Sequence, residues 1–91
     1  FEVEATLIQH PAVLEAAVIG VVDGDGLTKT KAYVVRKGGA EVSEEELKRF
    51  VKERLAPYKY PRQIEFIDEL PKTATGKIQR FRLRERAAKP T

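Results

Sequence analysis

A lysine in a small polar segment near the C-terminal end of the chain has the clearest chemical potential. Residues 70–80 read Leu-Pro-Lys-Thr-Ala-Thr-Gly-Lys-Ile-Gln-Arg, and place Lys77 directly after Gly76. Gly76 permits backbone conformations closed to other residues, Pro71 stiffens the entry, and the small neighbours leave the ammonium free to project. Because a lysine is charged at neutral pH, Lys77 could stabilise negative charge that develops on a bound anion. The alternative is an ordinary solvated loop lysine.

A second candidate is an aromatic and basic link in the middle of the chain, formed by Tyr58, Lys59, Tyr60 and Arg62. Aromatic faces beside cations could stack a nucleobase and hold a phosphate. The same residues could instead make a packed connection between a helix and a strand, and their types leave both interpretations open.

Other kinds of site fit the sequence poorly. A phosphate-binding P-loop would need glycine in place of Pro71 and a hydroxyl residue in place of Ile78, and Gly24 and Gly26 lack the third glycine of a dinucleotide fingerprint. His10 is the only histidine and the chain has no cysteine, so we predict neither a metal site nor a disulfide. We expect His10 to pack at the end of a helix or to lie on the surface.

Length and composition suit one soluble globular domain. The chain has 91 residues, of which 42% are hydrophobic and 34% charged, and a net charge of +3. No apolar run reaches the roughly 18 residues of a membrane span. The lack of cysteine is compatible with the cytosol, and we expect a cytoplasmic protein. The last third of the chain is basic, and it could attract phosphate-bearing partners or could form a solvated basic face. From residue 72 onward a single acid, Glu85, stands against Lys72, Lys77, Arg80, Arg82, Arg84, Arg86 and Lys89.

The elements that must position these residues follow from the hydrophobic pattern, which predicts the order α-β-β-α-β-α. The fold class is therefore α+β, with a small, mostly antiparallel sheet of about three strands flanked by helices. The first strand is apolar on both faces, which indicates an interior strand, and it should form an antiparallel hairpin with the second. We expect helices over 1–9, 43–56 and 80–88, and strands over 14–22, 31–36 and 63–67.

The middle helix has the best-marked start. Ser43 and Glu46 have the spacing of a capping box, in which each side chain bonds the other's free amide, and Val42 and Leu47 fit a hydrophobic staple. Glutamates in the first turn and bases in the last suit the helix dipole. We therefore expect this helix to be well formed, with one apolar stripe of Leu47, Phe50, Val51 and Leu55.

Residues 70–80 resemble the terminal lysine motif of the adenylate-forming enzymes, which include acyl-CoA synthetases, peptide-synthetase adenylation domains and luciferases. Residues 55–61 resemble the motif that precedes it, and residues 1–4 resemble the helix after the hinge between the two domains of these enzymes. Residues 10–13 and 16–21 also resemble family segments, so the likeness runs in order over nearly the whole chain. It is strongest to aryl-CoA ligases of the benzoate type.

The resemblance implies that residues 1–91 form the mobile C-terminal lid domain of an ATP-dependent ligase. The start at Phe1, without methionine, agrees with a large N-terminal domain in front. An aromatic carboxylate would attack the α-phosphate of Mg-bound ATP, and coenzyme A would then displace AMP after the lid rotates. Since the N-terminal domain would hold the ATP and acyl pockets, we expect the isolated chain to be inactive. We expect no membrane and no nucleic-acid partner.

The resemblance also assigns roles to residues. Lys77 matches the lysine that bridges the substrate carboxylate and the nucleotide oxygens during adenylation. Tyr58, Lys59 and Tyr60 align with the link that contacts the CoA nucleotide. Tyr60 stands where one relative has arginine, so Lys59 or Arg62 could replace that phosphate contact, and the loop 23–29 could border this face.

Regulation at the same lysine is implied as well, because many acyl-CoA synthetases are acetylated at the matching residue by a protein acetyltransferase and restored by a deacetylase. Acetylation removes the positive charge. Acetyl-Lys77 should therefore block adenylation and spare CoA transfer. Normal pyrophosphate release by the acetylated full-length enzyme would contradict this expectation.

Two alternatives remain open at the level of sequence. The basic C-terminal third, together with Tyr58 and Tyr60, could form a small nucleic-acid-binding module, which should bind as the isolated chain with a steep salt dependence. The chain could also belong to an adenylation domain that loads the pantetheine arm of a carrier protein instead of free CoA.

Overall fold

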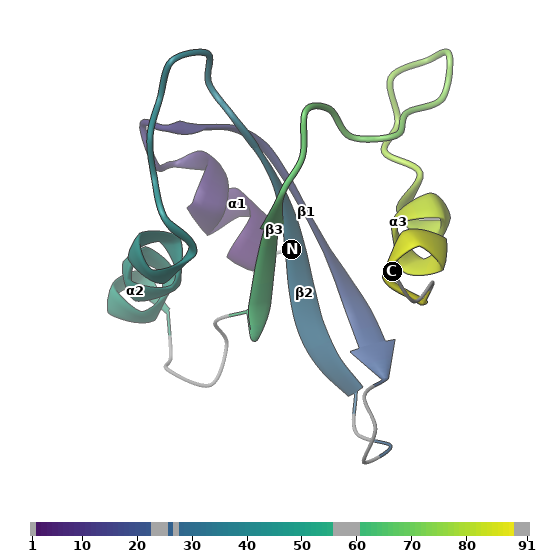
Figure 1. Ribbon diagram of the computed structural model, residues 1–91, viewed down its shortest axis with the longest axis horizontal. Coiled ribbons are helices and arrows are strands. Elements are labelled where there is room, and N and C mark those ends of the chain that lie inside the picture. The colour runs from purple at the N-terminus through teal and green to yellow at the C-terminus, as the bar shows by residue number, and fades with distance from the viewer. Residues whose placement is uncertain (1, 23–25, 27, 56–60, 89–91) are drawn as a thin grey trace.

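The computed structural model describes residues 2–22, 26, 28–55 and 61–88 (Figure 1). The predicted order α-β-β-α-β-α and the α+β class are confirmed. Pro11 follows the first helix closely, because the residue before a proline avoids the helical conformation. The elements are α1 (Glu2–Ile8), β1 (Val13–Val22), β2 (Thr28–Arg36), α2 (Glu44–Arg54), β3 (Gln63–Phe66) and α3 (Arg80–Ala88).

The sheet is mixed, with β2 in its centre. The long β1–β2 pairing is antiparallel, which confirms the predicted hairpin, whereas the short β3 lies parallel to β2 on its other side. The expectation of an interior position for the first strand was wrong, because β1 is an edge strand in the order β1-β2-β3. Its apolar pattern arises because helices cover both faces of the sheet.

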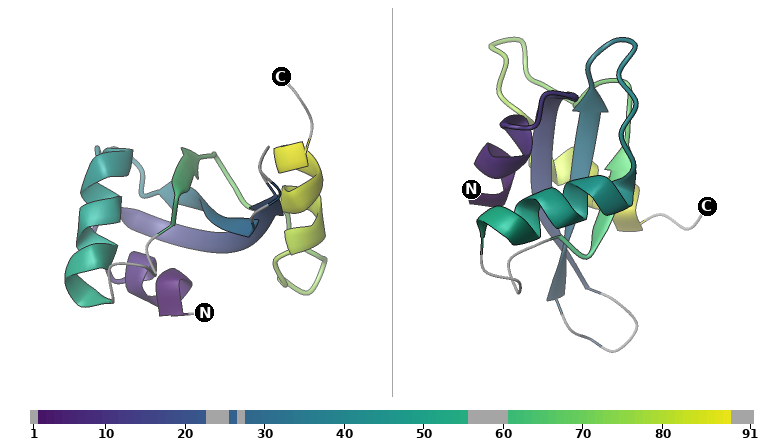
Figure 2. Two further views of the ribbon diagram at one scale, coloured as in Figure 1. Left: turned by 90° about the horizontal axis from the view of Figure 1, so that it is seen from below. Right: turned by 90° about the vertical axis from the view of Figure 1, so that its left-hand side faces the viewer.

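Helices α1 and α2 cover one face and α3 covers the other (Figure 2, left, purple and teal against yellow). Successive residues of β2 point to opposite faces, so the strand contributes to two separate cores. The core under α1 and α2 contains Leu7, Val13, Ala16, Ala32, Val34, Val42, Leu47, Val51 and Ile64. The core under α3 contains Ala17, Ile19, Tyr33, Val35, Leu70 and Leu83.

The start of α2 shows how the expected capping box is modified. The Ser43 hydroxyl accepts the amide of Glu46 at 3.1 Å, as predicted. The Glu46 carboxylate, however, lies 2.9 Å from Nε2 of His10. Nδ1 of His10 accepts a hydrogen bond from the Ala12 amide at 3.1 Å. The imidazole ring packs edge-on against the Phe50 ring, with 4.8 Å between the ring centroids. His10 therefore joins the end of α1 to α2, which confirms its expected role at a helix end.

Candidate functional site: a lysine arm

The predicted lysine segment is an ordered hairpin that projects from the body of the domain (Figure 1, upper right). We call residues 71–79 the lysine arm. Its two sides pair through an antiparallel bridge between Lys72 and Ile78, and the Gln79 amide donates to the Pro71 carbonyl at 2.8 Å. The preceding Leu70 is only 3% exposed and anchors the arm in the core under α3. Main-chain hydrogen bonds thus close the segment into one unit.

The tip of the arm is a tight turn ending in glycine. The amide of Gly76 donates to the Thr73 carbonyl at 2.9 Å, and the Thr73 amide donates to the Lys77 carbonyl at 2.8 Å. Gly76 has φ +88°, as the three-residue hairpin loop requires at its last position. The Lys77 amide donates to the Thr73 hydroxyl at 3.1 Å, so the backbone of Lys77 is held on both sides.

The side chain of Lys77 is exposed at this tip, and it makes no ion pair with any residue in the described part of the chain. The bases on either side behave differently. Lys72 forms an ion pair with Glu15 of β1, and Arg80 forms one with Glu4 of α1. The arm therefore presents one uncommitted ammonium group on a rigid support, which can approach an anion on another body.

Only part of the second candidate can be placed, because Tyr58, Lys59 and Tyr60 lie outside the described residues. Arg62 is exposed, and its amide donates to the Thr30 carbonyl of β2 at 3.0 Å. This contact places Arg62 beside the hairpin end, where a hollow of about 210 Å³ is lined by Val21, Lys29, Thr30, Arg62 and Gln63. Of the loop 23–29, Lys29 lies beside Arg62 in this hollow.

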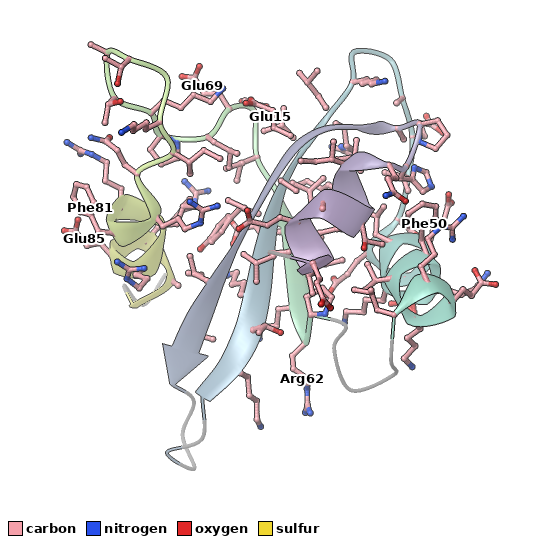
Figure 3. All side chains as sticks on the ribbon, turned by 180° about the vertical axis from the view of Figure 1, so that it is seen from behind. Glu15, Phe50, Arg62, Glu69, Phe81 and Glu85 are labelled. Atoms are coloured by element: carbon pink, nitrogen blue, oxygen red, sulfur yellow. The ribbon has the colours of Figure 1, made fainter. Side chains whose placement is uncertain are left out.

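The two candidates lie at opposite ends of the sheet. Arg62 precedes β3, whereas Glu69, just before the lysine arm, follows it, and Figure 3 shows these two labelled residues at opposite ends of the molecule. The structure therefore does not bring Lys77 and Arg62 together. Lys77 and Arg62 are thus parts of two separate candidate sites.

Much of the basic C-terminal third is neutralised inside the domain. Besides the pairs of Lys72 and Arg80, Arg86 of α3 binds Glu65 of β3 through Nε at 3.0 Å and Nη2 at 2.9 Å. This internal pairing weighs against a basic nucleic-acid surface. Sequence reasoning missed all three acids, although a lone glutamate within the apolar run of β1 was a signal for Glu15.

Glu65 forms ion pairs with both Lys31 and Arg86, and we call these three residues the Glu65 cluster. Partial burial alone would raise the pKa of Glu65, but hydrogen bonds from Lys31 and Arg86 outweigh it and hold the pKa below its ordinary value. Burial would likewise lower the pKa of Lys31, yet its bond to Glu65 at 3.0 Å leaves that pKa raised. The carboxylate is therefore kept charged and ties α3 to the sheet.

Comparison with known proteins assigns this architecture to a family. Residues 2–77 match the family described as the AMP-binding enzyme C-terminal domain. The chain belongs to this family. It is 63% identical over 86 residues to a benzoate–CoA ligase of Thauera aromatica, a match that covers 91% of this chain and 16% of the relative. The resemblance inferred from the lysine motif is thus confirmed.

Solved structures agree. A benzoate CoA ligase from Burkholderia xenovorans has a TM-score of 0.85 and 66% identity over 91% of this chain and 17% of its own. An anthranilate CoA ligase in complex with anthranoyl-AMP has a TM-score of 0.86 and 55% identity over 94% of this chain and 17% of its own. This AMP-binding C-terminal domain is therefore homologous to part of CoA ligases, and spans about a sixth of their length. Within its described residues, no helix is long and apolar enough to cross a membrane.

Proposed function

We propose that the chain is the mobile C-terminal domain of an ATP-dependent aryl-CoA ligase of the benzoate type, and that Lys77 provides the positive charge for adenylation. The observation that carries the proposal is the exposed ammonium of Lys77 on a hydrogen-bonded arm whose flanking bases, Lys72 and Arg80, are already paired. The high identity to benzoate and anthranilate CoA ligases supports the aromatic substrate class.

In this mechanism Lys77 acts on two anions at once. A carboxylate and the α-phosphate of Mg-bound ATP repel each other, and an ammonium between them offsets that repulsion and the charge that builds up on the phosphoryl oxygens. Such an electrostatic role needs a rigid support, because a charge must already point at the reacting oxygens when the bond forms. The closed hairpin and the left-handed conformation of Gly76 supply that support.

The opposite end of the sheet is our candidate for the thioester step. There Arg62 and Lys29 line one hollow, and Tyr58, Lys59 and Tyr60 shortly precede Arg62 in the sequence. We propose that this basic end contacts the phosphates of coenzyme A after the domain rotates. Since the two sites face different ends of the domain, a rotation would exchange one for the other in front of a fixed N-terminal pocket.

The test uses Lys77→Ala in the full-length ligase, with each half-reaction measured alone. Pyrophosphate release from benzoate and ATP should fall roughly 100-fold or more, because the charge acts only while adenylate forms. Thioester formation from preformed benzoyl-AMP and CoA should stay about unchanged. The matched control is Lys37→Ala, which removes an exposed ammonium from the turn after β2.

Unchanged pyrophosphate release in the Lys77→Ala enzyme would contradict the proposal. Assaying free CoA beside a pantetheine-loaded carrier protein separates the two possible acceptors. A ligase of the proposed type transfers to free CoA.

A further inference from the structure

The carboxylate of Glu4 joins three elements at one point. Its Oε1 accepts Nη2 of Arg80 at 2.5 Å, and its Oε2 accepts Nε of Arg80 at 3.2 Å and the Val18 amide at 2.7 Å. Glu4 lies in α1, Val18 in the edge strand β1, and Arg80 at the point where the lysine arm enters α3. We propose that Glu4, acting through Arg80, is a positioning residue that sets the direction of the lysine arm. This inference rests on the proposed function of Lys77.

The geometry of the pair makes it a specific anchor. An arginine that offers two N–H groups to one carboxylate is fixed in direction as well as distance, which a single contact would not achieve. The Glu4 side chain is only 14% exposed, so water competes weakly for these bonds. The third hydrogen bond is donated by the Val18 amide, which lies on the free edge of β1. This bond holds the Glu4 carboxylate in place, so that the carboxylate does not follow Arg80 if the arm moves.

The arm depends on such anchors because its side toward α3 is open. A hollow of about 850 Å³ lies there, lined from the arm by Pro71, Lys72 and Gln79 and from α3 by Arg82 and Arg86. The arm meets the body at its base, where the side entering from Leu70 carries the Lys72–Glu15 ion pair and the returning side packs Ile78 against the core under α3. The angle of the arm is therefore decided at the base, and a small change there displaces Lys77 at the tip.

The location of Glu4 adds a functional consequence. In the proposed ligase, α1 is the helix that leads in from the N-terminal domain, so the Glu4–Arg80 pair couples that helix directly to the arm. Helix α1, strand β1 and the arm then turn as one body. Without the Glu4–Arg80 pair, rotation of the domain would bring Lys77 towards the nucleotide, but the direction of the lysine arm would not be fixed.

The experiment compares Glu4→Gln, Arg80→Gln and the double variant in the full-length ligase. The Glu4→Gln change keeps the shape of the side chain and one acceptor for Val18, and removes the charge that holds Arg80. Pyrophosphate release should fall roughly tenfold to 100-fold in either single variant, since a displacement of about 1 Å can cost that much. The double variant should be no slower than the singles, because each removes the same pair. Thioester formation from preformed benzoyl-AMP should be about unchanged.

The matched control is Glu69→Gln, which removes an exposed carboxylate next to the base of the arm (Figure 3) that makes no ion pair within the described residues. It should leave both half-reactions at the starting rate. A further comparison adds Glu4→Gln to Lys77→Ala. Since Glu4 acts through Lys77, the double variant should release pyrophosphate no more slowly than Lys77→Ala alone.

Failure of the inference can be told apart from failure of the proposed function. If Lys77→Ala slows adenylation and Glu4→Gln does not, the positioning role is wrong and the role of Lys77 stands. If Glu4→Gln slows both half-reactions equally, or lowers the unfolding temperature in step with activity, Glu4 only stabilises the fold. If Lys77→Ala leaves adenylation unchanged, the proposed function itself is wrong. Arg80→Gln, at a residue 35% exposed, repeats the test should the Glu4→Gln enzyme fail to fold.

Discussion

The tip of the lysine arm depends on the backbone of one residue, Gly76. Its φ of +88° lies where residues with a side chain are strained, although a Cβ added there would meet no atom within 4 Å. Glycine is thus required at position 76 because of the backbone conformation, and not because a side chain would clash with neighbouring atoms. Lys77 follows directly, so the direction of its side chain is set by a conformation that glycine makes accessible.

We expect Gly76→Ala to destabilise the arm by about 1 kcal/mol and to slow pyrophosphate release in the full-length ligase, because alanine rarely adopts a positive φ. The matched control is Gly38→Ala, since Gly38 also has open space around its Cβ position but no positive φ. Urea unfolding of the chain and the pyrophosphate assay measure the two effects. Equal behaviour of the two variants would show that the left-handed turn is dispensable.

Helix α3 illustrates how an element is held when its own sequence anchors it weakly. Leu83 is the only fully buried side chain among the described side chains of α3. The helix also begins with a basic residue, which the helix dipole disfavours. Ion pairs offset this at both ends, through Glu4 to Arg80 and through Glu65 to Arg86. The attachment of α3, which fixes one side of the lysine arm, is therefore electrostatic as well as hydrophobic.

The Glu65 cluster predicts a dependence of stability on pH. Because the pKa of Glu65 is lowered in the folded state, its contribution is complete above the ordinary value of 4.5 and is lost as pH falls through the folded pKa. Glu65→Gln should reduce the free energy of unfolding by less than about 1 kcal/mol at pH 7, since the group is partly exposed. The loss should shrink below pH 4.5, as followed by urea unfolding of the 91-residue chain.

Glu85→Gln is the matched control for this measurement, because Glu85 is an exposed carboxylate on α3, the helix that Glu65 binds through Arg86 (Figure 3). Its unfolding free energy should equal the wild-type value at pH 7. A Glu65→Gln loss that persists at low pH would mean that packing, and not charge, holds α3 in place.

At the scale of the whole molecule, the lysine arm and the Arg62 end occupy opposite ends of one small sheet. Under the proposed function, this separation would let one rigid domain serve two half-reactions by turning between them. Strand β2 connects the two ends, since its first residues lie beside Arg62 and its last lie towards the segment that leads into the arm. The sheet is thus the rigid body on which both sites are carried.

We expect Arg62→Ala to raise the KM for CoA roughly tenfold in the full-length ligase, as loss of one charged hydrogen bond would. Pyrophosphate release should stay unchanged, which is the reverse of the Lys77→Ala pattern. The control is Arg84→Ala, which removes an exposed guanidinium from α3. An equal effect of Arg62→Ala on both half-reactions would contradict the division of labour between the two ends.

The local features of the chain could be predicted well from sequence. The helix start at Ser43, the special backbone conformation of Gly76 and the β1–β2 hairpin depend on residues close together in the chain, and each was confirmed. The edge position of β1 and the diversion of Glu46 from its capping box to His10 were not foreseen. Both depend on segments far apart in sequence.

The sequence by itself determined the order of elements, the conformational freedom at Gly76 and the exposed charge of Lys77, because spacing and side-chain chemistry act over a few residues. Tertiary structure alone decided that β3 joins β2 in parallel, that the two basic sites lie at opposite ends, and that Glu4 holds Arg80. Glu4 and Arg80 are 76 positions apart, so their ion pair forms only after packing has brought α1 and α3 to the same edge strand. Residue spacing in the sequence cannot predict such a contact.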